Sequence, residues 1–239
     1  MSPSIASLVE RQIPGAVSTA RAVAAAAEDY AIRPVLPVRA DLAALLPATG
    51  LPRGSTIAVD GSTPLLLTLL ATATARGWWA AIVGMPNLGA LAAGELGVAL
   101  DRLALIPDPG AAVATVVAAL LDGVDLVAVA ANRLVGGGSQ GQAMARRLAA
   151  RARNRGAVLI PFGTGGWRPA AELRLSATDR RWTGLGDGHG YLAGHDAVVT
   201  VRGRGSAARP MQARLTLQAD APDQSRGEGL PTAPDVRVG

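Results

Sequence analysis

Apolar residues in the middle of the chain form short continuous runs, and segments with a helical spacing of apolar positions separate these runs. Such runs are typical of strands buried on both faces, as in a parallel sheet. The predicted strands span residues 56–60, 79–84, 103–106, 124–130 and 157–161. The predicted helices span residues 41–46, 64–76, 86–95, 111–121 and 142–155. This alternation predicts an α/β fold in which helices flank a mostly parallel sheet.

After Phe162 the pattern changes to an alternation of polar and apolar residues. This alternation is typical of antiparallel strands with one buried face. It covers residues 171–182, 197–204 and 211–218, with glycine-rich turns between them. We therefore expect an antiparallel C-terminal extension on the parallel sheet.

The two ends of the chain differ from this central pattern. Residues 1–39 contain two helical patterns followed by the proline-containing stretch 33–37, which predicts an N-terminal helical arm and an extended linker. The arm either docks on another molecule or folds back on the core. The core is predicted to span residues 40–219. Residues 220–239 are rich in Pro, Gly, Asp and Arg, and this composition predicts a disordered, flexible tail.

Composition limits the classes of function. The chain has no cysteine, which excludes disulfides and cysteine-ligated metals. We find neither a signal-peptide pattern nor an uninterrupted apolar run of about 18 residues, so a cytoplasmic protein without membrane contact is expected. The formal net charge of +5 and the sequence pI of about 11.0 favour an anionic partner such as DNA.

The stretch around Gly61 has the layout of a phosphate-binding loop, in which a strand ends at a glycine and a helix follows. Ser62 or Thr63 is the expected N-cap, and Pro64 falls in the first helical turn. However, a working loop needs about four variable residues and a lysine for the phosphates. All 23 basic residues of this chain are arginines, and the helix begins two residues after Gly61. We therefore expect a degenerate loop at Gly61, Ser62 and Thr63 without a nucleotide cofactor.

Several stretches resemble the ATPase core of the RecA family. They are Leu51-Pro-Arg-Gly-Ser before the first strand, residues 95–103, residues 174–182, and residues 196–210. The resemblance covers roughly residues 36 to 219 and implies a RecA-like core.

The sequence departs from the RecA pattern where the ATPase chemistry would lie. The phosphate loop is shorter by about five residues. Met85 stands where the family has its catalytic glutamate, and Ala130 stands where it has the aspartate that orients magnesium. The loops that line DNA in RecA filaments are here short and glycine-rich, at 136–141 and 163–166. These losses together imply a protein that is not an enzyme.

A RecA-like core with these losses is similar to the actinobacterial ImuA-prime family of mutasome accessory proteins. That resemblance implies a non-catalytic scaffold in DNA-damage-induced mutagenic translesion synthesis. Its expected partner is an ImuB-like inactive Y-family polymerase, and through it an error-prone replicative-type polymerase. A DNA-binding or RecA-modulating protein is the alternative, and a nucleotide hydrolase with a non-standard loop is the least favoured hypothesis.

Candidate contact residues fall in two regions. In helix 142–155, arginines flank an apolar face, which indicates either solvated flanks or a patch that contacts phosphates. The candidate DNA contacts are Arg146, Arg147, Arg151, Arg153, Trp167 and Arg168. In the tail, a segment that orders on a partner would use its few apolar residues and two arginines. These candidate partner contacts are Leu230, Pro231, Val236, Val238, Arg226 and Arg237.

Two further groups of residues have a structural interpretation. Asp187, His189, His195 and Asp196 could be drawn as a metal or acid–base cluster, but the glycines around them favour a turn between strands, so no metal site is expected. At least one of Trp78 and Trp79, and also Trp182, are expected in the core.

Overall fold

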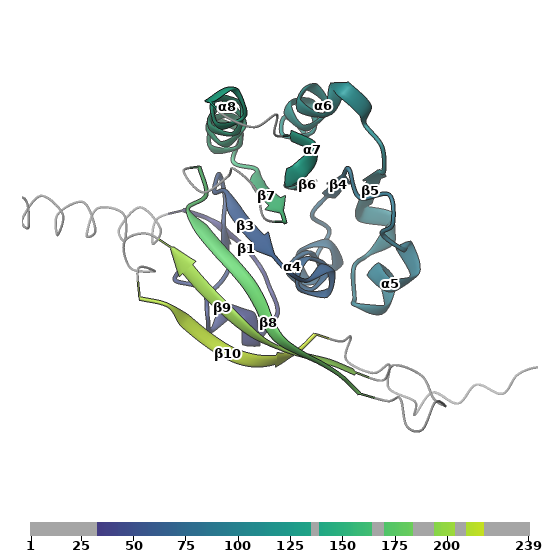
Figure 1. Ribbon diagram of the computed structural model, residues 1–239, viewed down its shortest axis with the longest axis vertical. Helices are drawn as coiled ribbons and strands as arrows, with labels where there is room; N and C mark the ends of the chain where they lie inside the picture. Colours follow the sequence, from purple (N-terminus) through teal and green to yellow (C-terminus); the bar gives the residue numbers. More distant parts are fainter. Residues whose placement is uncertain (1–32, 135–138, 164–169, 184–193, 204–208, 218–239) are drawn as a thin grey trace, which may run out of the picture.

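The computed structural model describes residues 33–134, 139–163, 170–183, 194–203 and 209–217. The expected helices within residues 1–32 and the expected tail lie outside these ranges. The described part forms an α/β fold with a mostly parallel sheet flanked by helices, as predicted (Figure 1). No helix in these ranges is both long and apolar enough to cross a membrane.

Eight strands of the described part form one mixed sheet. They are β3 (Ile57–Asp60), β4 (Ala80–Val83), β5 (Leu103–Ile106), β6 (Leu126–Ala130), β7 (Val158–Phe162), β8 (Leu173–Thr183), β9 (Gly194–Gly203) and β10 (Met211–Thr216). Their order across the sheet is β10-β9-β8-β3-β7-β6-β4-β5. The pairs from β8 to β5 are parallel, and β8, β9 and β10 pair antiparallel with one another.

Helices cover both faces of the parallel part of the sheet (Figure 1). The α-helices are α3 (Ala40–Ala43), α4 (Thr63–Ala75), α5 (Ala90–Glu95), α6 (Val113–Leu120), α7 (Ala131–Leu134) and α8 (Ser139–Arg155), and the short 3-10 helices are η1 (Leu100–Arg102) and η2 (Gly110–Ala112). Helices α4 and α5 lie on one face, and α6, α7 and α8 lie on the other. The strand side chains alternate between two apolar clusters, so Leu126 and Ala128 join the first and Val127 and Val129 the second.

The extended segment before residue 40 contributes to the core. Strand β1 (Val35–Leu36) pairs antiparallel with β2 (Leu51–Pro52), and Leu36 is fully buried. Val38 joins the same apolar cluster. The stretch predicted as a linker is therefore extended, as expected, but its end packs on the domain.

Four elements differ from their predicted form. Helix α5 begins at Ala90 rather than at residue 86, because residues 86–89 form a turn and Gly89 is the N-cap. Helix α8 begins at Ser139, three residues early. Helix α7 was not predicted, since four residues are too few to show a helical period. Strand β8 pairs antiparallel with β9 but parallel with β3. The parallel pairing was not predicted, because alternating polarity indicates one exposed face and does not indicate strand direction.

The predictions for the tryptophans were wrong. Trp78 and Trp79 are 38% and 43% exposed, and Trp182 is 56% exposed. Strand β4 begins only at Ala80, so both Trp78 and Trp79 precede the buried strand. Each is partly covered by an arginine instead: the guanidinium of Arg53 lies 5.0 Å from the ring centre of Trp78, and Arg102 lies 5.2 Å from that of Trp79.

Candidate functional site

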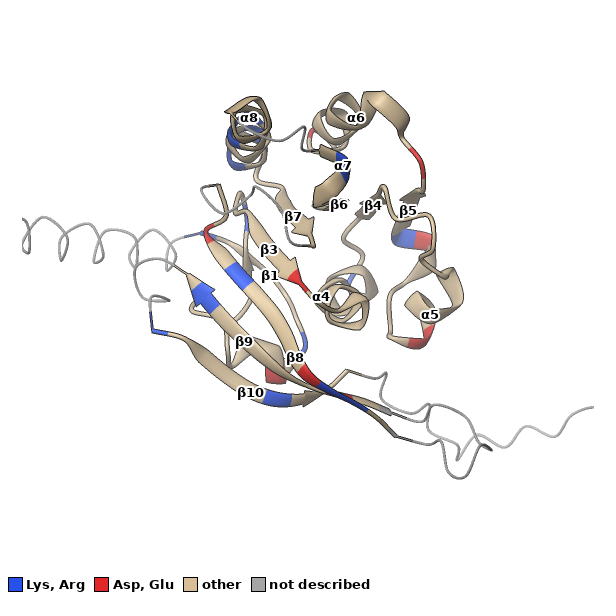
Figure 2. Cartoon of the chain, in the orientation of Figure 1, with Lys and Arg blue, Asp and Glu red and all other residues tan. Residues whose placement is uncertain are grey.

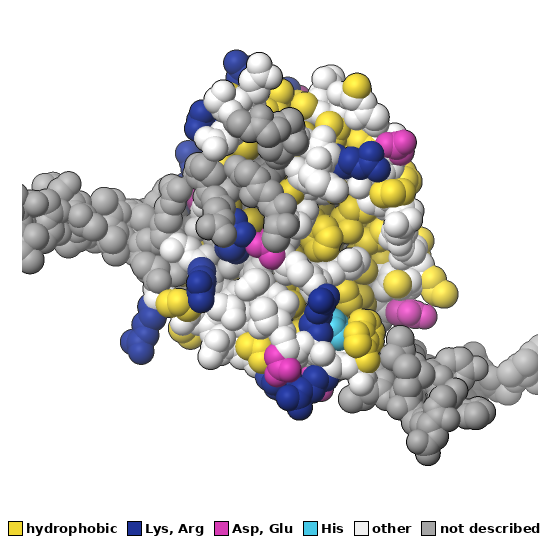
Figure 3. Space-filling view, viewed as in Figure 1, with side chains coloured by type: hydrophobic (Ala, Val, Ile, Leu, Met, Phe, Trp, Pro, Cys, Tyr) yellow, Lys and Arg dark blue, Asp and Glu magenta, His cyan; other side chains and the backbone are white. Residues whose placement is uncertain are grey.

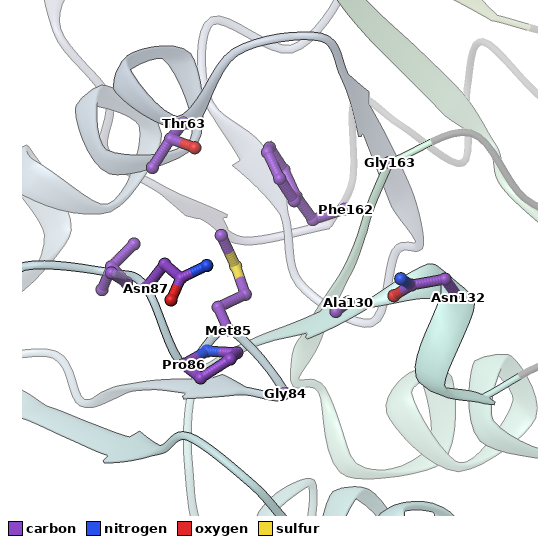
Figure 4. Close-up of a pocket in the computed structure, with 10 residues that line it drawn as sticks. Thr63, Gly84, Met85, Pro86, Asn87, Ala130, Asn132, Phe162 and Gly163 are labelled. Atoms are coloured by element: carbon purple, nitrogen blue, oxygen red, sulfur yellow. The ribbon is translucent and has the colours of Figure 1, made fainter.

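A pocket of about 400 Å³ opens where the carboxyl ends of β4, β6 and β7 meet the start of α4 (Figure 4). Its lining consists of Thr63, Gly84, Met85, Pro86, Asn87, Leu88, Ala130, Asn132, Phe162 and Gly163. In open α/β sheets, ligands bind at this edge. The structure thus brings together three positions that the sequence singled out: Thr63, Met85 and Ala130.

The start of α4 offers few free donors to a phosphate. Of the two candidate N-caps, Ser62 is the one that caps the helix, and its buried hydroxyl accepts a hydrogen bond from the backbone N–H of Leu65 at 3.2 Å. Pro64 has no N–H. Of the backbone N–H groups that bind anions at a helix start, that of Leu65 is therefore occupied and that of residue 64 is missing.

Gly61 is held in a conformation that favours glycine. Its φ is +85°, and a Cβ at this position would lie 3.0 Å from the carbonyl oxygen of Ala177 in β8. The carbonyl oxygen of Gly61 accepts a hydrogen bond from Arg180 at 2.6 Å. The loop is thus tied to β8 through the Gly61 carbonyl.

The pocket lining is neutral. Met85 follows β4, and in Figure 4 its side chain rises between Asn87 and Phe162 toward Thr63. Ala130 ends β6 and is 7% exposed. Of the described residues that line the pocket, none is charged. Thr63, Asn87 and Asn132 supply a hydroxyl and two amides, so the site suits an uncharged group with an apolar surface better than a metal-bound phosphate.

The carboxylate closest in sequence to the loop is used elsewhere. Asp60 ends β3 and forms an ion pair with Arg174 of the neighbouring strand. The Asp60 Oδ1 atom is buried and has no partner among the described residues. Asp60 is not part of the pocket lining, so it does not replace the acidic groups that the pocket lacks.

Comparison with known proteins places the chain in a family. Residues 44–168, more than half of the chain, match the model of the MT3502 N-terminal domain. The chain belongs to the MT3502 N-terminal domain family. It is also 44% identical over 135 residues to the uncharacterized protein Rv3395c of Mycobacterium tuberculosis. That alignment covers 56% of this chain and 63% of the relative, so the chain spans less than two thirds of the relative's length.

The match to the MT3502 N-terminal domain includes every pocket-lining residue. Sequence reasoning had not singled out Asn87, Asn132 and Phe162 as site residues. Each of them follows or ends one of the strands β4, β6 and β7. The carboxyl ends of parallel strands meet at one edge of the sheet. The position of these residues at the strand ends was therefore the sequence feature that could have marked them as site residues.

Of the four residues that could be drawn as a metal or acid–base cluster, His195 and Asp196 lie in strand β9 rather than in the expected turn. His195 lies in β9, is 3% exposed, and stacks on the Trp182 ring with 4.1 Å between ring centres and 20° between planes. The hydroxyl of Thr216 donates to Asp196 Oδ1 at 2.7 Å. Asp187 and His189 lie outside the described residues. Among the residues that are described, no group of three or more His, Cys, Asp or Glu is placed to hold a metal.

The environment of His195 disfavours its charged form. Neither ring nitrogen has a hydrogen-bond partner among the described residues. Burial lowers the pKa of His195 below its ordinary 6.5, and the charge of Arg180 acts in the same direction while Asp196 opposes it. His195 is therefore neutral at physiological pH.

Helix α8 has the face that its sequence predicted. Ala145, Leu148 and Ala152 are buried. Arg151 donates to Asp122 at 2.9 and 2.5 Å, and Arg155 donates to the same carboxylate at 3.0 Å. The hydrogen bond from Arg151 holds the pKa of Asp122 below its usual range.

The other candidate DNA contacts on α8 differ in whether they pair with a carboxylate. Arg153 pairs with Glu172 at 3.0 Å. Arg146 and Arg147 are exposed and have no ion pair among the described residues. Trp167 and Arg168 lie outside those residues. Two of the four candidate arginines on α8, Arg151 and Arg153, are thus bound to carboxylates.

Proposed function

We propose that this chain is a non-catalytic scaffold with a RecA-like core, an ImuA-prime protein that acts in mutagenic translesion synthesis. One observation carries the non-catalytic part: the pocket at the position of a nucleotide site has no charged residue in its described lining. Phosphoryl transfer depends on charged groups that cradle phosphates and hold magnesium.

Three further features support the loss of nucleotide chemistry. Ser62 caps its own helix, Pro64 removes a donor, and Met85 and Ala130 occupy the positions of the two expected acids. The α/β fold with a mostly parallel sheet agrees with a RecA-like core. The mutasome assignment itself rests on the sequence resemblance.

In this proposal the partner is an ImuB-like inactive Y-family polymerase, which links the scaffold to an error-prone replicative-type polymerase. The contact is assigned to residues 220–239, whose apolar anchors are Leu230, Pro231, Val236 and Val238. Arg226 and Arg237 would pair with acidic residues of the partner. Such a segment gains order on binding, and this ordering reduces its affinity.

The experiment is a binding titration of the purified chain with the ImuB-like protein, using the full chain and a variant that lacks residues 221–239. Deletion should leave the melting temperature almost unchanged and weaken binding at least tenfold, about 1.4 kcal/mol. A catalytically active Y-family polymerase serves as the control partner. Absence of binding by the full chain would reject the scaffold proposal, whereas binding that survives the deletion would move the interface to the core or the N-terminal segment.

A DNA-binding or RecA-modulating protein is the alternative function. Among its described candidate contacts, Arg146 and Arg147 form no ion pair with another described residue, whereas Arg151 and Arg153 pair with carboxylates.

A further inference from the structure

The antiparallel strands β8, β9 and β10 have one buried face and one face over which none of the described helices lies (Figure 1). The buried side chains include Leu175, Val199 and Leu215, which belong to the first apolar cluster. The opposite side chains define a surface that we call the basic sheet face. It consists of Arg174, Ser176, Thr178, Asp196, Val198, Thr200, Arg202, Gln212, Arg214 and Thr216. Asp196 is the carboxylate in this set, and it accepts a hydrogen bond from the Thr216 hydroxyl. Figure 2 shows arginines on each of the three strands.

Two arginines on this face lie directly opposite each other. The strand register pairs Arg174 of β8 with Arg202 of β9. Like charges in directly opposite positions destabilise an antiparallel pair. Arg174 is compensated by Asp60, but the exposed Arg202 has no ion pair or hydrogen bond within the described residues. Two arginines in directly opposite positions are unfavourable in the free protein. Such a pair is expected at a functional surface, where the negative charge of a bound partner offsets the repulsion.

The rest of the face adds charge and neutral donors. Arg214 of β10 pairs with Asp179, and Arg181 shares that carboxylate, so one negative charge serves two guanidinium groups. Between the arginine rows, Ser176, Thr200 and Gln212 lie side by side in the register. Hydroxyl and amide side chains of this kind donate to phosphate oxygens. In Figure 3, dark blue arginine side chains lie around white surface on this side of the molecule, together with magenta acidic side chains.

We propose that the basic sheet face contacts the phosphate backbone of duplex nucleic acid without reading its sequence. Arg214 pairs with Val198 of β9, four residues from Arg202. The two arginines are therefore about 13 Å apart along the strand direction, which is the rise of about four base pairs along a duplex axis. This site is separate from α8, and the inference does not rest on the scaffold function.

The absence of aromatic residues from this face decides against single-stranded partners, which bind by stacking their bases on aromatic rings. The exposed Trp182 lies on the other side of the sheet. A bulge between Thr178 and Arg181, with Asp179 at φ +44°, shifts the register and pairs Trp182 with His195. The sheet therefore offers phosphate donors on one face and its aromatic residue on the other.

The test is fluorescence anisotropy with labelled duplex DNA of two unrelated sequences, measured at several salt concentrations. Each lost phosphate contact should lower the slope of log affinity against log salt by about 0.9. Arg202→Gln should lower the slope by about one contact, and Arg202→Gln with Arg214→Gln by about two, equally for both sequences. Arg202→Gln breaks no ion pair among the described residues, so the melting temperature should not fall.

Two double variants with the same loss of charge are the controls. Arg146→Gln with Arg147→Gln tests α8. Arg76→Gln with Arg102→Gln tests distant positions, since Arg76 ends α4 on the opposite face and Arg102 precedes the opposite edge strand, β5. Both control pairs should leave the slope unchanged.

The proposal is overturned if the full chain does not bind duplex DNA at low salt or if the Arg202 and Arg214 variants keep the wild-type slope. Equal losses in all three double variants would also overturn it, because they would show only an effect of net charge. Binding of poly-glutamate without binding of duplex DNA would assign the face to an acidic protein segment instead.

Discussion

Three residues at the start of α4, Gly61, Ser62 and Pro64, decide what the loop can bind. Gly61 allows the tight turn beside β8. The Ser62 hydroxyl occupies one backbone N–H of the first helical turn, and Pro64 has no backbone N–H to offer. The sequence predicted the cap and the turn, because both follow from local residue chemistry. It did not show that Arg180 holds the Gly61 carbonyl, since that contact joins residues far apart in the chain.

We predict that Gly61→Ala destabilises the protein more than Gly77→Ala does. Both glycines have positive φ, +85° and +93°, so alanine is strained at either site by about 1 kcal/mol. Only at Gly61 does the new Cβ approach a backbone atom, the Ala177 carbonyl at 3.0 Å; nothing lies within 4 Å at Gly77. Chemical denaturation should give losses of about 2–3 kcal/mol and about 1 kcal/mol, respectively. Equal losses would show that β8 does not confine the loop.

His195 should make stability depend on pH. Its pKa is lowered in the folded state, so below about 6.5 the unfolded chain takes up a proton that the folded chain does not. Above pH 6.5 the neutral His195 makes its full contribution to the free energy of unfolding. As the pH falls below 6.5 toward the lowered folded-state pKa, this contribution is lost. His195→Phe keeps a ring for Trp182 to stack on and should remove this dependence, whereas His189→Phe should retain it. Parallel stability curves for wild type and His195→Phe between pH 7.5 and 5 would contradict the assignment.

At the scale of elements, the apolar runs predicted the five parallel strands of the central sheet to within about two residues at each end. They succeeded because buried strands leave a continuous signal. The same signal placed Trp78 and Trp79 in the core, although they precede β4 and are partly covered by arginines. The direction of β8 also could not be predicted, since side-chain alternation is the same in parallel and antiparallel strands.

Helix α4 provides a test of the role of Ser62. Because its hydroxyl caps the helix, Ser62→Ala should lower the free energy of unfolding by about 1 kcal/mol. Thr63→Ala should have a smaller effect, since Thr63 has no capping bond in the described structure. Thermal and urea denaturation of the two variants measure this difference. A larger loss of unfolding free energy for Thr63→Ala would show that Thr63, and not Ser62, caps the helix.

At the scale of the whole molecule, the carboxyl edge of the sheet retains a pocket but lacks the charged groups of a nucleotide site. The sequence shows the missing charged groups only as isolated positions, and the fold brings Thr63, Met85 and Ala130 around one cavity. The amides of Asn87 and Asn132 were not predicted, because their proximity depends on the order of β4 and β6 in the sheet. The basic sheet face likewise depends on strand register, which no local pattern fixes.

The central claim is that this pocket does not hold nucleotide phosphates, and a thermal-shift titration with ATP and magnesium tests it most directly. At millimolar ATP the melting temperature should rise by less than about one degree, since weak binding gives little mass-action stabilisation. A saturable rise that Ser62→Ala and Thr63→Ala abolish would contradict the account and restore a nucleotide site at the start of α4.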